Sequence, residues 1–179
     1  ATTESGAVNV ISDRGAIIAR HRVNDRAMRG AVAPDGGGVA WSCLNGAVYY
    51  RDLAGERRWR HPFKNVCRSF SISRGGAFSA ATANNRLWYV DGAGEVFWDR
   101  ETTWWITASA IADDASLVAV GGEGGEVLVL SEDGNRAWEA KLPARVVRLR
   151  FSPKGGFLSA ETDAGDVQLE GRDGLIQQL

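Results

Sequence analysis

Apolar and polar side chains alternate with a period of two in five short segments of this sequence. A period of two sends successive side chains to opposite faces of an extended chain, so each segment predicts a β-strand with one inward face. Each segment begins directly after a two-residue turn signal that most often contains glycine or asparagine. The inward positions are Val8 and Val10, Val48 and Tyr50, Leu87 and Tyr89, Val127 and Val129, and Val167 and Leu169.

Turn residues recur in two series that share one register of 39 or 40 residues. A two-residue hairpin turn needs a positive φ, which glycine and asparagine tolerate best. Each series therefore predicts one tight turn in every repeat. One series is Gly6, Gly46, Asn85, Gly125 and Gly165, and the other, nine residues later, is Gly15, Gly55, Gly94, Gly134 and Gly174.

Two more strand-like segments precede the alternating segment in each repeat, and a fourth follows it. The first strands are expected at residues 27–32, 66–71, 106–111 and 146–151. Four antiparallel strands in each unit predict an all-β fold, a β-propeller built of four-stranded antiparallel blades with a period of about 40 residues. We expect one array over residues 1–179, with a partial blade at 1–25 and blades at about 26–65, 66–105, 106–145 and 146–179.

Three tryptophans stand at one repeat position, four residues after a turn glycine. They are Trp59, Trp98 and Trp138. Aromatic side chains that recur in a repeat bury a large area, so we interpret these three as wedges between adjacent blades.

Two motifs resemble those of known propeller families. The segments from Asp52 to Trp59 and from Asp91 to Trp98 are similar to the aspartate, glycine, tryptophan pattern of the quinoprotein-like repeat. The turns at 33–36 and 152–155 resemble the serine, proline, aspartate, glycine turn of WD repeats. The third copy departs from the pattern with Ser131 in place of the aspartate. The resemblance implies a propeller that binds other proteins, as most members do, while the quinone-dependent dehydrogenases use larger rings, calcium and paired cysteines that this sequence does not match.

Composition narrows the function classes. The net charge is −1, and general affinity for nucleic acid needs a basic surface. Two cysteines, Cys43 and Cys67, are too few for a disulfide framework or a four-cysteine zinc site, and we expect buried thiols. No apolar run approaches the roughly 18 residues of a membrane helix, and Ala1 does not open a secretion leader. We expect a soluble protein of unassigned compartment, with the cytoplasm favoured over export.

Residues with catalytic or metal-binding chemistry are sparse. His21 and His61 are the only histidines, and they share one position on the outermost strands, so we interpret them as part of the repeat. Glu161, Asp163 and Asp166 surround one turn and suit either calcium or solvent. We expect no enzyme activity, no metal and no cofactor.

Arginines on the predicted innermost strands are the first candidate site. Arg29, Arg68 and Arg148 are expected to share one position near the central channel, where they would bind an anion, a carboxylate or a peptide, or else pair with local carboxylates. Trp104 and Trp105, between the second and third blades, are a second candidate contact, with at least one of the two expected in the core.

The predicted function is a non-catalytic β-propeller scaffold for protein–protein interaction or assembly. The alternatives are a small-molecule, sugar-binding or enzymatic propeller with a site in the central channel, and a structural subunit that assembles with its own copies. The strand count gives four blades and a half. We therefore expect a protein partner or a second copy to complete the array, unless the chain is a segment of a larger propeller.

Overall fold

The computed structural model describes residues 6–63, 65–82, 85–153, 155–165, 167–171 and 176–178. They form one two-stranded hairpin and four four-stranded sheets, in which each strand pairs antiparallel with the next strand along the chain. This confirms the predicted antiparallel meanders. The hairpin is β1 (Ala7–Ile11) and β2 (Ile17–Arg22); sheet 1 is β3 (Ala27–Val32), β4 (Gly38–Cys43), β5 (Ala47–Asp52) and β6 (Arg57–Pro62); sheet 2 is β7 (Cys67–Ile72), β8 (Phe78–Thr82), β9 (Arg86–Val90) and β10 (Val96–Glu101), with the short 3₁₀ turn η1 (Arg74–Gly76) after β7; sheet 3 is β11 (Ile106–Ile111), β12 (Leu117–Gly122), β13 (Glu126–Ser131) and β14 (Arg136–Lys141); sheet 4 is β15 (Val146–Phe151), β16 (Phe157–Thr162), β17 (Val167–Gly171) and β18 (Ile176–Gln178).

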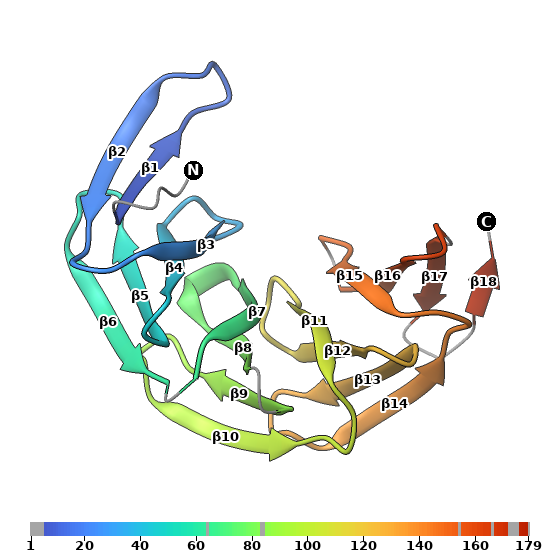
Figure 1. Ribbon diagram of the computed structural model, residues 1–179. Helices are drawn as coiled ribbons and strands as arrows, with labels where there is room; N and C mark the ends of the chain where they lie inside the picture. Colours follow the sequence, from blue (N-terminus) through green and yellow to red (C-terminus); the bar gives the residue numbers. More distant parts are fainter. Residues whose placement is uncertain are drawn as a thin grey trace.

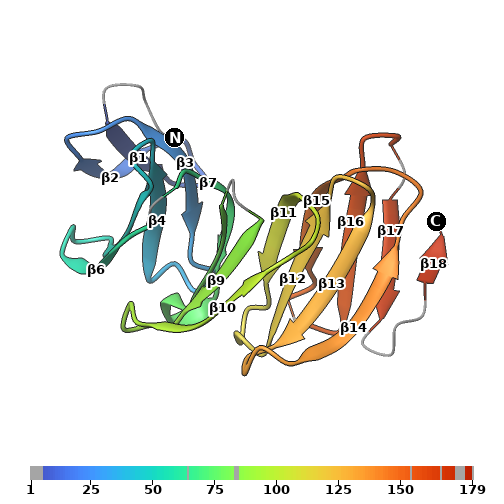
Figure 2. The same ribbon diagram turned by 60° about the horizontal axis from the view of Figure 1, so that its bottom comes forward.

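The sheets follow one another along an arc (Figure 1). The first strands β3, β7, β11 and β15 lie on the concave side, and the last strands β6, β10 and β14 lie on the convex side (Figure 1). Turned by 60°, the same sheets stand as successive layers (Figure 2). Neighbouring first strands are joined by side chains: the Ser109 N–H donates to Ser69 Oγ at 2.9 Å, and Thr107 Oγ1 donates to the Val146 carbonyl at 2.5 Å. The arc is open between the hairpin and sheet 4 (Figure 1).

The turn prediction is confirmed at every series position that the structure describes. The earlier series has φ between +57° and +93°, and the later one between +80° and +92°, with residue 174 outside the described residues. Gly46 shows the steric reason, because a Cβ there would lie 2.3 Å from the Phe63 carbonyl oxygen. Only glycine combines this φ with so close a backbone contact.

Tryptophans fill the spaces between successive sheets. Trp59 is 5% exposed, packs edge-on against Phe78 of sheet 2 at 5.5 Å between ring centres, and lies against Gly94. Trp98 lies on Gly134 of sheet 3, and its indole N–H donates to the Glu132 carbonyl at 2.7 Å. The predicted wedges are therefore confirmed at two interfaces. Trp138 is partly buried in the core between sheets 3 and 4.

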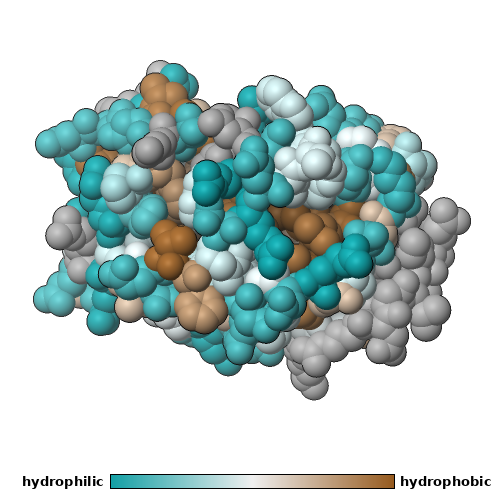
Figure 3. Space-filling model, turned by 90° about the horizontal axis from the view of Figure 1, so that it is seen from below, coloured by the Kyte–Doolittle hydropathy of each residue, from teal (hydrophilic) through white to brown (hydrophobic). Residues whose placement is uncertain are grey.

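The convex side is mostly hydrophilic, with separate hydrophobic areas between hydrophilic ones (Figure 3). β10, which lies on this side, leaves Phe97 64% exposed. No helix in the described part of the chain has the length and apolar character needed to cross a membrane.

Candidate functional site

The three candidate arginines do not share one structural position. Arg29 pairs across its sheet with Ser42, and Arg148 pairs with Glu161 at the equivalent place. In sheet 2 the equivalent place belongs to Ser69, which pairs with Ala81. The first hairpin runs from Cys67 to Thr82 in sheet 2 and from Ala27 to Cys43 in sheet 1. The first hairpin of sheet 2 is thus one residue shorter than that of sheet 1. The expected shared position is wrong for Arg68, and the expected strand at 66–71 begins one residue later, at Cys67.

Each arginine has different surroundings. The Arg68 guanidinium lies over the Trp105 ring at 5.4 Å from the ring centre, so the structure brings two candidate residues together. Arg148 donates to the Glu161 carboxylate at 2.8 Å, which is the local ion pair that the sequence left open. Arg29 lines a groove between β1 and β3. All three side chains are exposed.

Trp104 and Trp105 face different environments. Trp104 is half-buried against the core between sheets 2 and 3, as expected for one of the pair. Trp105 remains 52% exposed and carries the Arg68 guanidinium on its face. An indole with one face on a cation and half its area in solvent is available to a binding partner.

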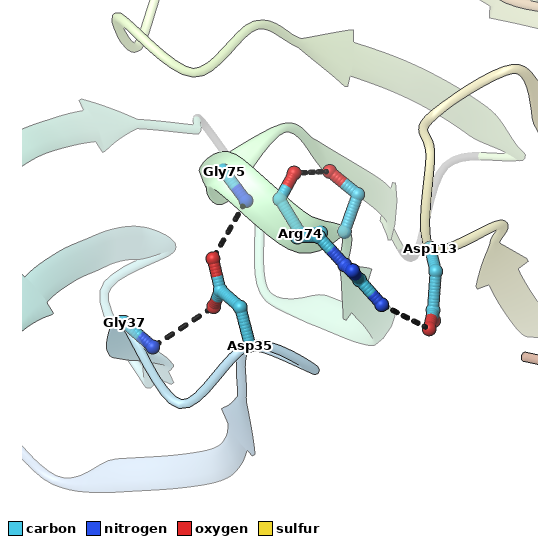
Figure 4. A network of polar contacts seen from close by, with 6 residues as sticks. Asp35, Gly37, Arg74, Gly75 and Asp113 are labelled. Carbon is cyan, nitrogen blue, oxygen red and sulfur yellow. Dashed lines mark hydrogen bonds and ion pairs between the residues drawn. The ribbon is translucent and has the colours of Figure 1, made fainter.

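A polar network connects the turns that follow the first strands of sheets 1, 2 and 3 (Figure 4). The Asp35 carboxylate accepts from the Gly37 N–H at 2.8 Å and from the Gly75 N–H at 3.2 Å. The Arg74 N–H donates to the Asp113 carbonyl at 2.8 Å, and the Arg74 guanidinium lies 3.8 Å from the Asp113 carboxylate. The N–H donors, Gly37 first, lower the pKa of Asp35, so this carboxylate stays charged. The network fixes neighbouring turns and was not predicted from the sequence.

The two histidines differ in burial. His21 is buried and stacks on Trp41 at 5.4 Å, and its Nε2 has no hydrogen-bond partner within the described residues. Burial is the main cause that lowers the pKa of His21, followed by the charge of Arg51. His61 is half-buried, lies against Phe63 at 4.4 Å between ring centres with the rings tilted by 51°, and has its pKa lowered mainly by burial. His21 pairs with Val8 and His61 pairs with Val48 at equivalent places, in agreement with their interpretation as part of the repeat.

A hollow of about 470 Å³ lies beside His61, between sheets 1 and 2. Phe63 and Trp88 form its aromatic side, and Arg86 and Glu101 supply charge. The Arg86 guanidinium already covers the Trp88 ring at 5.6 Å and pairs with Asp99. The Arg86 guanidinium is thus engaged by side chains of sheet 2.

Metal and thiol chemistry receive no support from the geometry. Within the described ranges, no three His, Cys, Asp or Glu side chains are grouped so that they could hold a metal ion. Of the candidate calcium ligands, Glu161 pairs with Arg148, and Asp166 lies outside the described residues. Cys43 and Cys67 are free and buried, as expected. Burial raises their pKa values to about 11 and about 12, so both thiols are protonated at neutral pH.

Sequence comparison finds no matching family model and no matching curated protein. Structure comparison finds Sqt1 of Saccharomyces cerevisiae, a WD-repeat protein, with a TM-score of 0.78 over 98% of this chain at 15% identity. The described sheets have the fold of part of a β-propeller. The chain spans 56% of the length of Sqt1. At this identity the likeness establishes the fold alone, and a fold does not by itself determine a function.

Proposed function

We propose that this chain is a non-catalytic β-propeller scaffold that binds other proteins. The observation that carries the proposal is the exposed Trp105 ring with the Arg68 guanidinium stacked on it. Tryptophan and arginine are the side chains most enriched among residues that dominate protein–protein binding energy. Here they stand at the junction of sheets 2 and 3, where β11 begins. Arg29 adds exposed positive charge on the first strand of sheet 1, whereas the charge of Arg148 on sheet 4 is paired with Glu161.

Comparative capture tests the proposal. Wild-type chain and the variants Arg68→Ala, Trp105→Ala and Arg136→Ala are immobilised, and the proteins retained from a native lysate are quantified by mass spectrometry. We expect at least one protein to bind wild type and Arg136→Ala equally and to bind the other two variants about tenfold less. Arg136 is a matched control, because it is exposed on the outer strand β14 and its ion pair within the described residues is with Glu139.

Two results would contradict this assignment. The first is an identical set of retained proteins for all four chains, with unchanged circular dichroism. The second is hydrolase or oxidoreductase turnover by the purified chain that His61→Ala abolishes.

We also infer that a protein partner or a second copy of the chain completes the blade array, which we count as four blades and a half over residues 1–179. The open arc in Figure 1 supports this inference. The greater length of Sqt1 fits the alternative, in which the sequence is a segment of a larger propeller. Light scattering at micromolar concentration, alone and with a captured partner, tests it. A monomer whose density map shows a closed four-bladed ring would refute it.

A further inference from the structure

The Arg68 side chain stands at a β-bulge that recurs in the first strand of each four-stranded sheet. In sheet 2 the pairing of β7 with β8 passes from Cys67 to Ser69, so Arg68 has no residue opposite it. A bulge re-aims the side chain of the unpaired residue. The equivalent unpaired residues in sheets 1, 3 and 4 are Met28, Thr107 and Val147. The bulge, and not the spacing of the sequence, therefore assigns Arg68 its structural counterparts.

At two of these bulges the side chain contacts the next sheet along the arc. Thr107 of sheet 3 donates from Oγ1 to the carbonyl of Val146 at 2.5 Å, and Val146 begins sheet 4. Arg68 of sheet 2 lies over the ring of Trp105, directly before the first strand of sheet 3. Sheets 2 and 3 have a further sheet on either side, so this junction lies inside the arc (Figure 1). The repeat thus places a cation at a position where its three counterparts are neutral.

The N–H donors of Arg68 have no acceptor among the described residues. No hydrogen bond or ion pair joins this guanidinium to a residue that the structure describes, whereas Arg148 donates to the Glu161 carboxylate at 2.8 Å. The contact of Arg68 is with the Trp105 ring, which has no oxygen acceptor. A guanidinium carries five N–H donors in a planar fork that matches both oxygens of a carboxylate. Arg68 is therefore suited to an acidic group from outside the chain.

The Trp105 ring adds an apolar contact beside these donors. About half of the ring surface is exposed, and the Trp105 carbonyl accepts from the Glu123 N–H at 3.0 Å, which holds the backbone in place. An aliphatic side chain on the exposed part of the ring would remove apolar surface of both groups from water. Phosphorylated motifs are bound by clusters of arginines, whereas one guanidinium matches the single charge of a carboxylate. The pair therefore fits one carboxylate next to one aliphatic side chain.

We propose that Arg68 and Trp105 together bind an acidic–apolar segment of a partner protein. In this segment an aspartate or glutamate pairs with Arg68, and a neighbouring leucine, isoleucine or valine packs on Trp105. The inference rests on the proposed scaffold function and names the partner chemistry of the same site.

Selection from a peptide library tests this chemistry without knowledge of the partner. Random peptides displayed on phage are first depleted on the Arg68→Gln chain and then selected on the wild-type chain, so that clones requiring Arg68 remain. We expect the enriched clones to carry aspartate or glutamate next to leucine, isoleucine or valine. The leading sequence is then synthesised in two forms, one with its acid and one with the matching amide, and binding is measured by fluorescence anisotropy.

The two peptides form a double-mutant cycle with Arg68. Arg68→Gln should weaken binding of the acidic peptide about tenfold, and the amide peptide should bind wild type about tenfold more weakly and be insensitive to Arg68→Gln. Arg68→Lys keeps the charge without the planar fork and should restore only part of the binding. Trp105→Ala should weaken both peptides, because the apolar contact is common to them. Arg136→Gln removes an exposed arginine from β14 and should leave binding unchanged.

Three results would overturn the proposal, given variants with unchanged circular dichroism. They are the absence of any enriched clone that depends on Arg68, equal binding of the acidic and amide peptides to wild type, and tighter binding of a peptide with phosphoserine in place of the acid. The last would identify a phosphopeptide site. If lysate proteins still depend on Arg68 and Trp105 for capture, the scaffold function stands and only the acidic–apolar segment is wrong.

Discussion

Replacing Trp59 by alanine should remove the wedge that joins sheets 1 and 2. The side chain is 5% exposed, and its ring contacts Tyr50, Phe78 and Gly94. A buried tryptophan covers roughly 150 to 250 Å², and truncation to alanine in a core costs about 3 to 5 kcal/mol. We expect a loss of about 4 kcal/mol in the free energy of unfolding, a large share of the 5 to 15 kcal/mol typical of domains.

Urea unfolding followed by circular dichroism measures this loss, at a pH where both histidines are neutral. With a slope near 2 kcal/mol per molar, the midpoint should fall by about 2 M. Trp59→Phe should cost less, because the Trp59 indole N–H has no partner to lose within the described residues. Trp105→Ala is the matched control, since that ring is 52% exposed and its removal should cost below about 1 kcal/mol. Equal losses for Trp59→Ala and Trp105→Ala would refute the wedge.

Acidification, turn substitution and thiol labelling test three other features. Burial, with the Arg51 charge, lowers the pKa of His21 from 6.5. The stability that neutral His21 contributes is therefore complete above pH 6.5 and falls as the pH drops below that value. His21→Gln should flatten this fall, and an unchanged pH profile of the unfolding free energy would contradict the assignment. Gly46→Ala should lower the free energy of unfolding by about 2 kcal/mol or more, because φ is +83° and the new methyl group meets a carbonyl oxygen. Gly36→Ala, with φ +70° and open space around the new methyl group, should cost about 1 kcal/mol. Equal losses of stability in urea would count against the close contact at Gly46. Cys67, with a pKa of about 12, should react with a thiol reagent only after unfolding, and labelling in native buffer at the rate of free cysteine would show that it is exposed.

Sequence spacing predicts the strands because the turns are fixed by backbone conformation. Positive φ at Gly46 or Asn85 is a local requirement, and it is visible as residue type at a constant interval. The wedges at Trp59 and Trp98 are visible for the same reason, since each follows its glycine by four residues.

The position of Arg68 could not be predicted from spacing. A repeat shorter by one residue can lose that residue from the β6–β7 connection or from the β7–β8 hairpin with the same spacing of the turn glycines. Only the pairing of Cys67 with Thr82 shows that the loss lies between β7 and β8. The groove beside Arg29 was also missed, because its walls come from two different sheets and depend on how those sheets pack.

The docking of each sheet on the next has a consequence for how such a chain can change over time. At one junction His21 lies against Gly55, at the next Trp59 lies against Gly94, and at the third Trp98 lies against Gly134. The receiving glycine is constant, while the inserted ring and its exact position differ. Each junction can therefore exchange its side chains, and one turn can lose a residue, without disturbing the junctions further along the arc. Such a protein can keep its shape while its sequence changes.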